Sequence, residues 1–269
     1  MAISLVIPCF NEEGMISACL DSVVAQTRQF DEVIVVDNNS RDRTVQIASS
    51  YSDRLPIRLL RESRQGVAFA SQAGYDAAAG DVIARIDADT RLDPRWAARA
   101  VAYFDENADV DGLAGAGWLY GMSRCSGKVK ALASAERFPD TAVADTWFMN
   151  GNNCAIRRSA WLKVRGTVKN LPGTHEDIDV SCALGDAGCT MRVLPGMLAA
   201  LSPRRFAGRF RDNVKYGAAV VRTLVAYRRW KLTALYVVGL PINLATVAVW
   251  GVYARRGQGK GLRPSPVTR

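Results

Sequence analysis

Two aspartates that directly follow an apolar run are the most suggestive residues of the sequence. Asp87 and Asp89 come after Asp81–Ile86, a short segment rich in Val and Ile that predicts a strand. Side chains at positions i and i+2 of an extended segment point to the same side, so both carboxylates can face one crevice. Mg²⁺ binds proteins through one or two carboxylates together with phosphates and water. The pair therefore predicts a metal site for a diphosphate, and a turn with exposed acids is the alternative.

Polar and acidic residues also follow two other predicted strands. Pro8–Glu13 comes after Ile3–Ile7, and Asp37–Asp42 comes after Glu32–Val36. Parallel sheets bind ligands beyond the carboxyl ends of their strands, so we expect these segments to meet at one edge. The sequence contains neither a P-loop motif nor a G-x-G-x-x-G motif. A metal held by carboxylates would then replace the missing glycine cradle for phosphates.

A parallel sheet flanked by helices would position these residues. Its predicted strands are Ile3–Ile7, Glu32–Val36, Ile57–Leu60 and Asp81–Ile86. Helical patterns lie between them, at residues 16–24, 44–51 and 67–79. Strands spaced about 25 residues apart with intervening helices indicate right-handed β-α-β units. Runs that are apolar on both faces indicate a sheet covered by helices on both sides, which is an α/β fold.

The second half of the chain gives weaker patterns. Asp93 and Pro94 favour the start of a helix. Apolar patterns predict strands at residues 109–118, 150–157 and 190–193 and a helix at 176–187. Residues 119–149 show no clear pattern, and no low-complexity stretch precedes residue 254.

The ordered motifs of this sequence resemble those of family 2 glycosyltransferases with the GT-A fold. The resemblance is carried, in chain order, by Ser4–Glu13, Val35–Thr44, Gln65–Ala68, Gly80–Asp89, Gly151–Arg158 and His175–Asp177. Each motif alone is weak, but their order is specific, and together they span roughly residues 1–195. The resemblance implies a catalytic domain with a Rossmann-like, mostly parallel sheet and a nucleotide-diphosphate sugar as donor. Residues 196–269 lie outside it.

The resemblance implies a donor pocket at the start of the chain. Pro8, Phe10 and Glu12 would line the nucleotide pocket, Asp37 would hydrogen-bond the base, and Arg64 would reach the nucleotide. The alternative for Pro8 and Phe10 is a strand-ending turn packed on the core. For Asp37 the alternative is turn chemistry, because Asp side chains often hydrogen-bond nearby backbone.

The resemblance further implies inverting transfer assisted by a divalent metal. Asp89 would ligate Mg²⁺ or Mn²⁺, and Asp87 would contact the ribose or support the metal. Asp177, with Glu176 beside it, would take the proton of the acceptor hydroxyl, while the metal stabilises the departing diphosphate. One base and one metal without a covalent intermediate give inversion. Asp177 as a helix cap and His175 as a structural histidine are the alternatives.

The same comparison favours transfer of a single sugar. Processive members of the family carry a Q-x-x-R-W motif, whereas Ala226 stands where Gln would precede Tyr227–Trp230. Two other functions are the alternatives. A sugar nucleotidyltransferase would show a Gly-rich basic loop in place of Pro8–Glu13, and a non-catalytic nucleotide-sugar-binding membrane scaffold would not need Asp89 and Asp177.

Charge is divided unequally along the chain. Residues 1–202 hold 21 Lys and Arg against 25 Asp and Glu, a net charge of −4. Residues 203–269 hold 14 Lys and Arg against Asp212 alone, a net charge of +13. An acidic body with a basic C-terminal quarter indicates a surface contact and argues against a nucleic-acid partner.

The basic quarter predicts contact with a membrane. Residues 203–231 form a predicted amphipathic helix, with a basic stripe of Arg204, Arg211, Lys215, Arg222 and Arg229. Residues 232–253 lack charge and are long enough to span a bilayer. However, Pro241 lies in their middle and basic clusters flank both ends, which favours a shallow or re-entrant helix pair. A helix packed on protein and an oligomer contact are the alternatives.

These patterns predict four regions. They are a catalytic domain at 1–202, an amphipathic helix at 203–231, a hydrophobic membrane-associated segment at 232–253 and a basic disordered tail at 254–269. No basic leader or cleavage site precedes the first strand, so we expect the protein at the cytoplasmic face of the cell membrane. Anionic lipid and a lipid-linked acceptor, for example a polyprenyl phosphate, would be its partners there.

Overall fold

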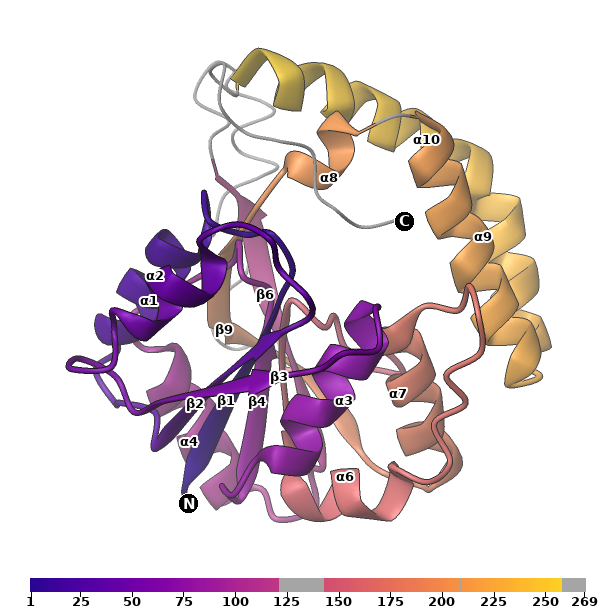
Figure 1. Ribbon diagram of the computed structural model, residues 1–269. Helices are drawn as coiled ribbons and strands as arrows, with labels where there is room; N and C mark the ends of the chain where they lie inside the picture. The colour runs from indigo at the N-terminus through magenta and orange to yellow at the C-terminus, as the bar shows by residue number, and fades with distance from the viewer. Residues whose placement is uncertain (121–142, 209, 258–269) are drawn as a thin grey trace.

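The computed structural model describes residues 1–120, 143–208 and 210–257. Its strands are β1 Ile3–Cys9, β2 Glu32–Asp37, β3 Ile57–Arg61, β4 Val82–Ile86, β5 Arg91–Leu92, β6 Gly112–Leu119, β7 Ala144–Asp145, β8 Asn153–Arg157 and β9 Met191–Leu201. Its helices are α1 Ile16–Val24, α2 Thr44–Ser49, α3 Val67–Ala77, α4 Trp96–Glu106, α6 Arg158–Val164, α7 Glu176–Asp186, α8 Arg204–Ala207, α9 Phe210–Ala226 and α10 Trp230–Gly257. Figure 1 shows a sheet covered by helices, with α8, α9 and α10 standing over one end of it.

The sheet confirms the α/β class and is parallel in its first half. Its strand order is β3-β2-β1-β4-β8-β6-β9-β5, with β7 paired to β9. β1 is parallel to both β2 and β4, and β2 is parallel to β3, as the spacing of the first four strands predicts. β8 then runs antiparallel to β4 and to β6, whereas β6 is parallel to β9. The second half of the sheet is therefore mixed, which the sequence pattern did not indicate.

Helices cover both faces of the sheet, which explains the apolar strands. Along β1, Ile3, Leu5 and Ile7 pack in one core with α1, α2 and α4, whereas Val6 packs in the other core with α3, α6 and α7. This division follows from the period of two in a strand, which sends successive side chains to opposite faces. Trp96 on α4 and Trp161 on α6 are the largest fully buried side chains of the two layers.

The register of the central strands brings the predicted site segments to one edge. Cys9, at the end of β1, lies opposite Asp37, at the end of β2. The Asn38 N–H donates to the Cys9 carbonyl at 2.8 Å, which continues the contact beyond the strands. On the other side of β1, Val6 lies opposite Arg85 of β4. The turns after β1, β2 and β4 are therefore neighbours, as expected for carboxyl ends of parallel strands.

The C-terminal quarter differs from its prediction in three ways. The stretch 203–231 is divided into the short α8 and the longer α9, so Arg204 does not share a helix with Arg211. The expected break at Pro241 is wrong, because α10 continues through it. A proline removes one helical hydrogen bond, yet apolar helices tolerate it where neighbouring groups compensate. Helix α10 also extends to Gly257, into the stretch predicted to be a disordered tail.

Other helix and strand boundaries also differ from those predicted. Strand β9 runs to Leu201, well beyond the predicted end at residue 193. Helix α4 begins at Trp96, and the Asp93 carboxylate accepts from the Arg95 N–H at 3.0 Å, close to the predicted start. The predicted tail beyond residue 257, and most of the stretch 119–149 that lacked a pattern, lie outside the described residues.

Candidate active site

The turns after β1 and β2 form one hydrogen-bonded unit. The Asn11 side chain accepts from the Arg41 N–H at 2.8 Å, and the Asn11 N–H donates to the Ser40 hydroxyl at 3.0 Å. The Glu12 N–H donates to the Thr44 hydroxyl at 2.7 Å. Asn11 has a φ of 54°, a left-handed conformation that Asn adopts more readily than most residues. This network fixes the place where the first two predicted donor segments meet.

The predicted donor residues of this unit differ in their surroundings. Pro8 is buried within β1, and Phe10 is half-buried just after it. One carboxylate oxygen of Asp37 accepts from the Ser40 N–H at 3.0 Å, which is the turn chemistry considered as its alternative. The same carboxylate has a second oxygen and is half-buried, so the turn contact leaves it able to bind a ligand.

Arg64 lies on a loop that a buried asparagine holds in place. Its guanidinium pairs with Glu62 at 2.9 Å and stacks over the Phe69 ring, 4.7 Å from the centroid. The Asn38 amide donates to the carbonyls of Glu62 and Arg64 at 2.8 and 2.7 Å, and its oxygen accepts from the Gly66 N–H at 2.7 Å. Asn38 was not predicted as a site residue, although its position next to Asp37 in the second motif was a signal.

Glu12 and Asp89 are joined by an arginine that was not expected at the site. The Arg204 Nη2 lies 2.7 Å from Glu12 Oε2 and 2.7 Å from Asp89 Oδ2. Its Nε donates to the same Asp89 oxygen at 3.0 Å. Burial raises the pKa of Glu12 to about 7, although the nearby guanidinium opposes the shift. The sequence placed Arg204 on an exposed basic stripe, whereas the structure places it inside the candidate site.

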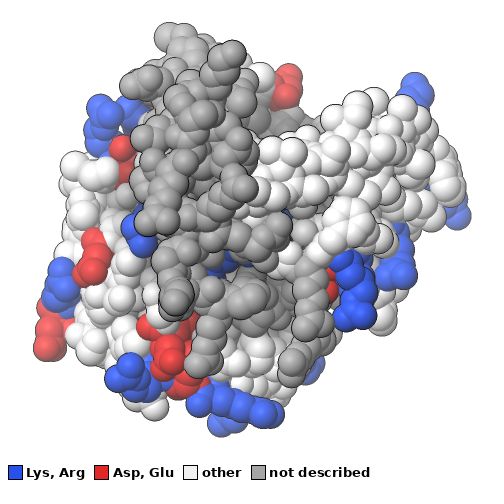
Figure 2. Space-filling model, turned by 90° about the horizontal axis from the view of Figure 1, so that it is seen from above, with Lys and Arg blue, Asp and Glu red and all other residues white. Residues whose placement is uncertain are grey.

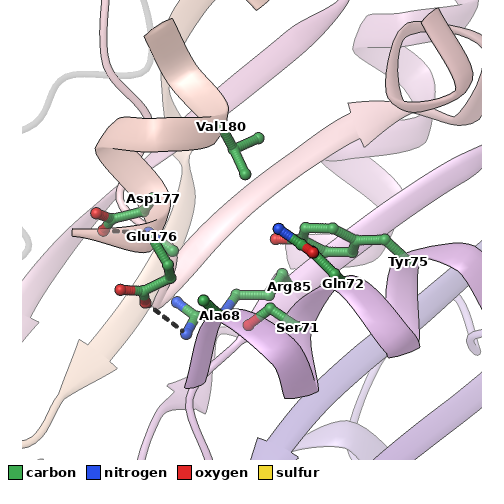
Figure 3. A pocket seen from close by; sticks show the side chains of 9 residues that line it. Ala68, Ser71, Gln72, Tyr75, Arg85, Glu176, Asp177 and Val180 are labelled. Carbon is green, nitrogen blue, oxygen red and sulfur yellow. Dashed lines mark hydrogen bonds and ion pairs between the residues drawn. The ribbon is translucent and has the colours of Figure 1, made fainter. Parts of the chain in front are cut away.

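A second buried arginine joins Asp87 to Glu176, and Figure 3 shows its contact with Glu176. Arg85 lies on β4 and is 3% exposed, and its Nη2 is 2.9 Å from Asp87 Oδ1 and 3.3 Å from Glu176 Oε1. Burial raises the pKa of Asp87 to about 6, against the opposing effect of Arg85. The guanidinium packs directly against Gly151, where a Cβ atom would overlap it. A charged residue inside the apolar run of β4 was the sequence signal for this role.

Asp177 lies at the start of α7, beside Gly151 and His175. One of its oxygens accepts from the Gly151 N–H at 3.0 Å, and the other forms an ion pair with the His175 ring. Burial favours neutral forms of both groups, but their mutual attraction outweighs it. This attraction lowers the pKa of Asp177 and raises the pKa of His175. Acidic residues are also favourable in the first turn of a helix, where the helix dipole is positive.

His175 connects this carboxylate to the C-terminal helices. Its ring lies edge-on against the Tyr216 ring of α9, with centroids 4.3 Å apart. The Arg205 guanidinium of α8 lies over the same tyrosine ring, 3.0 Å from its centroid. The His175 N–H of the backbone donates to the Thr223 hydroxyl at 2.7 Å. Both the Glu12–Asp89 pair, through Arg204, and His175, the partner of Asp177, therefore contact the C-terminal quarter.

The structure thus brings the candidate residues into two neighbouring groups. Glu12 and Asp89 lie with Arg204, and Asp87 lies with Arg85 and Glu176. A small pocket beside Arg85 is lined by Gly151 and by residues of α3 and α7, namely Ala68, Ser71, Gln72, Tyr75, Glu176, Asp177 and Val180 (Figure 3). Arg64 and Asp37 lie along the adjoining β2–β3 edge of the sheet.

The carboxylates have the chemistry that a hard divalent cation requires. Mg²⁺ and related ions prefer oxygen ligands, and Asp87, Asp89 and Glu12 supply them at one edge. A buried guanidinium on Asp89 shows that this position already accommodates positive charge. The ligand atoms of His175, Glu176 and Asp177 also lie within 4.8 Å of one another. In that second group, Asp177 already pairs with His175, and Glu176 pairs with Arg85. The group of Asp87, Asp89 and Glu12 therefore fits a metal better.

Comparison with known proteins identifies the class. Residues 4–135 match the model of Glycosyl transferase family 2. Glycosyltransferase AglE of Haloferax volcanii is 36% identical over 105 residues, which cover 37% of this chain and 34% of AglE. The undecaprenyl-phosphate 4-deoxy-4-formamido-L-arabinose transferase of Pectobacterium carotovorum is 34% identical over 116 residues, which cover 41% of this chain and 36% of that protein. The chain thus spans about a third of the length of these two curated relatives.

A solved structure shares the fold over nearly the whole chain. The mannosyltransferase PcManGT from Pyrobaculum calidifontis, solved with GDP-Man and Mn²⁺, superposes with a TM-score of 0.67. The superposition covers 96% of this chain and 76% of PcManGT at 19% sequence identity, which shows a shared fold. Residues 4–135 are therefore a family 2 glycosyltransferase domain, and the chain has a GT-A-like fold. The family match ends before Glu176, Asp177 and Arg204, so their roles rest on the geometry of the site.

Proposed function

We propose that this chain transfers a single sugar from a nucleotide-diphosphate sugar to an acceptor hydroxyl or phosphate, with inversion and with the help of a divalent metal. The observation that carries the proposal is the meeting of Glu12, Asp87 and Asp89 at one sheet edge, within a family 2 domain. Two of these three carboxylates follow β4 directly, where the crevice of a parallel sheet lies.

The donor would bind along the turns after β1 and β2. Asp37 would hydrogen-bond the base with its free oxygen, and Pro8, Phe10 and Glu12 would line the nucleotide pocket. Arg64 would reach the nucleotide from its loop on Asn38. Asp89 would hold Mg²⁺ or Mn²⁺, supported by Asp87, and a bound ion would act as a Lewis acid that stabilises the leaving diphosphate. PcManGT was solved with a nucleotide sugar and Mn²⁺, which supports a donor and metal of this class.

Asp177 would act as the general base. Its lowered pKa keeps it deprotonated at neutral pH, and each of its oxygens has a further lone pair besides the contacts to Gly151 and His175. The acceptor oxygen would attack the anomeric carbon as its proton passes to this carboxylate, and the bond to the diphosphate would break. A single direct displacement of this kind inverts the configuration. Glu176, held by Arg85, would orient the start of α7 beside the base.

The membrane is the proposed location, and a lipid-linked molecule is the proposed acceptor. Residues Trp230–Val252 of α10 form a helix long and apolar enough to cross a bilayer, with a mean hydropathy of 1.9 and only 6% of that window buried. Seen from above, the arm that contains α10 is largely uncoloured, with basic side chains gathered along its flank (Figure 2). The relative from Pectobacterium is named for an undecaprenyl-phosphate acceptor, which supports an acceptor of that chemistry. The basic quarter would hold the enzyme to the cytoplasmic face.

Thermal unfolding with nucleotide sugars tests the proposed donor and metal. A UDP-, GDP- or dTDP-sugar that binds with Mn²⁺ should raise the Tm of the wild-type chain by about 5 °C or more at 100 times its Kd. Asp89→Asn should lose the part of this shift that depends on Mn²⁺, because the metal loses a carboxylate ligand. Asp109→Asn is the matched control, since Asp109 and Asp111 are also two positions apart and Asp109 contacts Arg192 on the surface. A full Mn²⁺-dependent shift in Asp89→Asn would refute the metal assignment.

A further inference from the structure

Arg204 is a buried cation whose contacts the catalytic scheme above leaves unused. Its side chain is 4% exposed, and its Nη2 lies 2.7 Å from both Glu12 Oε2 and Asp89 Oδ2. It also donates from Nε to Asp89 Oδ2 at 3.0 Å and from Nη2 to Glu12 Oε1 at 3.0 Å. Two different nitrogens of one guanidinium thus contact the same oxygen of the proposed metal ligand.

The position of Arg204 in the chain makes these contacts informative. Arg204 is the first residue of α8, which connects the end of β9 to α9 and α10. It lies outside residues 4–135, the part that matches the family. Helix α8 stands over one end of the sheet (Figure 1). Through Arg204, the C-terminal quarter therefore places a positive charge on carboxylates that belong to the turns after β1 and β4.

Electrostatics gives this contact a role in the absence of metal. A buried carboxylate that loses its charged partner strongly destabilises a protein. Arg204 supplies the neutralising charge for Glu12 and Asp89, while Arg85 supplies it for Asp87 and Glu176. A divalent ion bound to Asp89 Oδ2 would lie within a few ångströms of the guanidinium and would be repelled by it.

We propose that Arg204 is an internal counter-cation that competes with the divalent metal for Asp89. Metal binding then requires the guanidinium to withdraw from Asp89 Oδ2. The diphosphate of the donor offers the withdrawn guanidinium a new bidentate partner, so nucleotide and metal favour each other's binding. This inference rests on the proposed function, because it assumes that Asp89 is a metal ligand.

Direct Mn²⁺ binding to the full-length chain tests the competition without any turnover. Free Mn²⁺ is measured by electron paramagnetic resonance in the absence of nucleotide. Arg204→Gln should bind Mn²⁺ about 10-fold more tightly than wild type, a coupling of ordinary size. With saturating UDP or GDP the difference should shrink, because the nucleotide already draws Arg204 away from Asp89 in the wild type.

Two further variants serve as controls for this experiment. Arg205→Gln removes the neighbouring charge, which stacks on Tyr216 and does not contact either carboxylate, and it should leave the Mn²⁺ affinity unchanged. Arg204→Lys keeps a charge but replaces the planar fork by a single ammonium. It should give an intermediate affinity, and it serves if Arg204→Gln fails to fold.

The outcomes separate this inference from the proposed function. Equal or weaker Mn²⁺ binding by Arg204→Gln, with clear binding by wild type in the presence of nucleotide, would overturn the competition and leave the metal assignment standing. The same affinity in Arg204→Lys as in wild type would also count against it if only that variant folds. Absence of Mn²⁺ binding from all variants, with and without nucleotide, would overturn both.

Discussion

At the scale of single residues, two buried arginines organise the charge of the candidate site. Arg85 and Arg204 are 3% and 4% exposed, and each contacts two carboxylates. Charged groups this deeply buried are held by their partners, since an unpaired charge in this environment is strongly unfavourable. The two arginines therefore connect the turn after β4 to α7 and the turns after β1 and β4 to α8.

The sequence predicted some of these residues and missed others for a physical reason. Asp87 and Asp89 were found because they follow a strand, and strand ends are set by local pattern. Arg204 lies 115 positions from Asp89 in the chain, and a contact over that distance leaves no local pattern. Its spacing relative to Arg211 even suggested a surface stripe. A break between α8 and α9 interrupts the helical spacing of Arg204 and Arg211, and this break is seen only in the structure.

The role of Asp177 can be tested by kinetics. Asp177→Asn should lower kcat by at least about 10²-fold, as expected for loss of a general base. The affinity for the donor should change little, because the proposed donor residues lie at the ends of β1, β2 and β4 and on the loop after β3. Single-turnover rates and donor titrations of the purified chain provide the two measurements.

Asp186→Asn is the matched control for that prediction. Asp186 lies on the same helix, is largely exposed and pairs with Arg229 at 2.5 Å, so its loss should leave the rate near that of wild type. A normal rate together with weak donor binding in Asp177→Asn would show that Asp177 binds the donor or only caps α7.

At the scale of elements, the strands and helices of the first half were the most predictable. Short apolar runs separated by amphipathic helices specify β-α-β units, and the four parallel strands confirm them. The antiparallel insertion of β8 between β4 and β6 was not predictable, because neighbouring strands in a sheet need not be neighbours in sequence. Strand β9 also contains Pro195 and Gly196, which look like a turn locally but lie inside its 11 residues.

Close packing of α3 on the sheet gives a prediction at this scale. Gly74 lies in α3 over Val6 of β1, and a Cβ atom added there would overlap the Val6 side chain. Gly74→Ala should therefore destabilise the chain, because overpacking typically costs about 1–3 kcal/mol. That exceeds the gain of up to about 1 kcal/mol from replacing Gly by Ala in a helix. Urea unfolding measures the difference.

A second glycine provides the comparison. Gly166 is exposed, and nothing lies within 4 Å of a Cβ atom added there, so Gly166→Ala should leave the unfolding midpoint nearly unchanged. Equal midpoints for the two variants would mean that α3 moves away from β1 without loss of stability.

At the scale of the whole molecule, charge and hydrophobicity are concentrated in one region. The last 67 residues carry a net charge of +13 on a chain whose first 202 residues carry −4. Within this quarter, α10 exposes large apolar side chains, with Leu235 71%, Val238 77% and Ile242 74% exposed. An apolar surface of this kind on a soluble monomer is unusual and commonly marks an interface with protein or membrane. The basic residues Arg211, Lys215 and Arg222 are exposed on the neighbouring α9.

Membrane attachment can be tested without truncating the chain. Removal of the whole quarter would delete Val220 and Leu224, which are buried in the second core, and would also remove Arg204. Replacing Leu235, Val238, Ile242 and Val249 by Ser instead removes apolar surface that the structure leaves exposed. Full burial of one such side chain in lipid contributes about 1.5–3 kcal/mol. The variant should therefore move from the membrane fraction to the soluble fraction on centrifugation, whereas wild type should need detergent.

The exposed basic residues of α9 allow a second test of membrane attachment. Each Lys or Arg near anionic lipid contributes about 1 kcal/mol, so replacing Arg211, Lys215 and Arg222 by Gln should weaken binding to anionic vesicles by about 10²-fold. Binding to neutral vesicles should change much less. The control replaces Arg54, Arg61 and Arg165, three exposed residues of the catalytic body, by Gln and removes the same charge. If both triple variants lose the same affinity, the effect is one of net charge. If wild type ignores anionic vesicles and is soluble without detergent, α10 covers a protein surface instead.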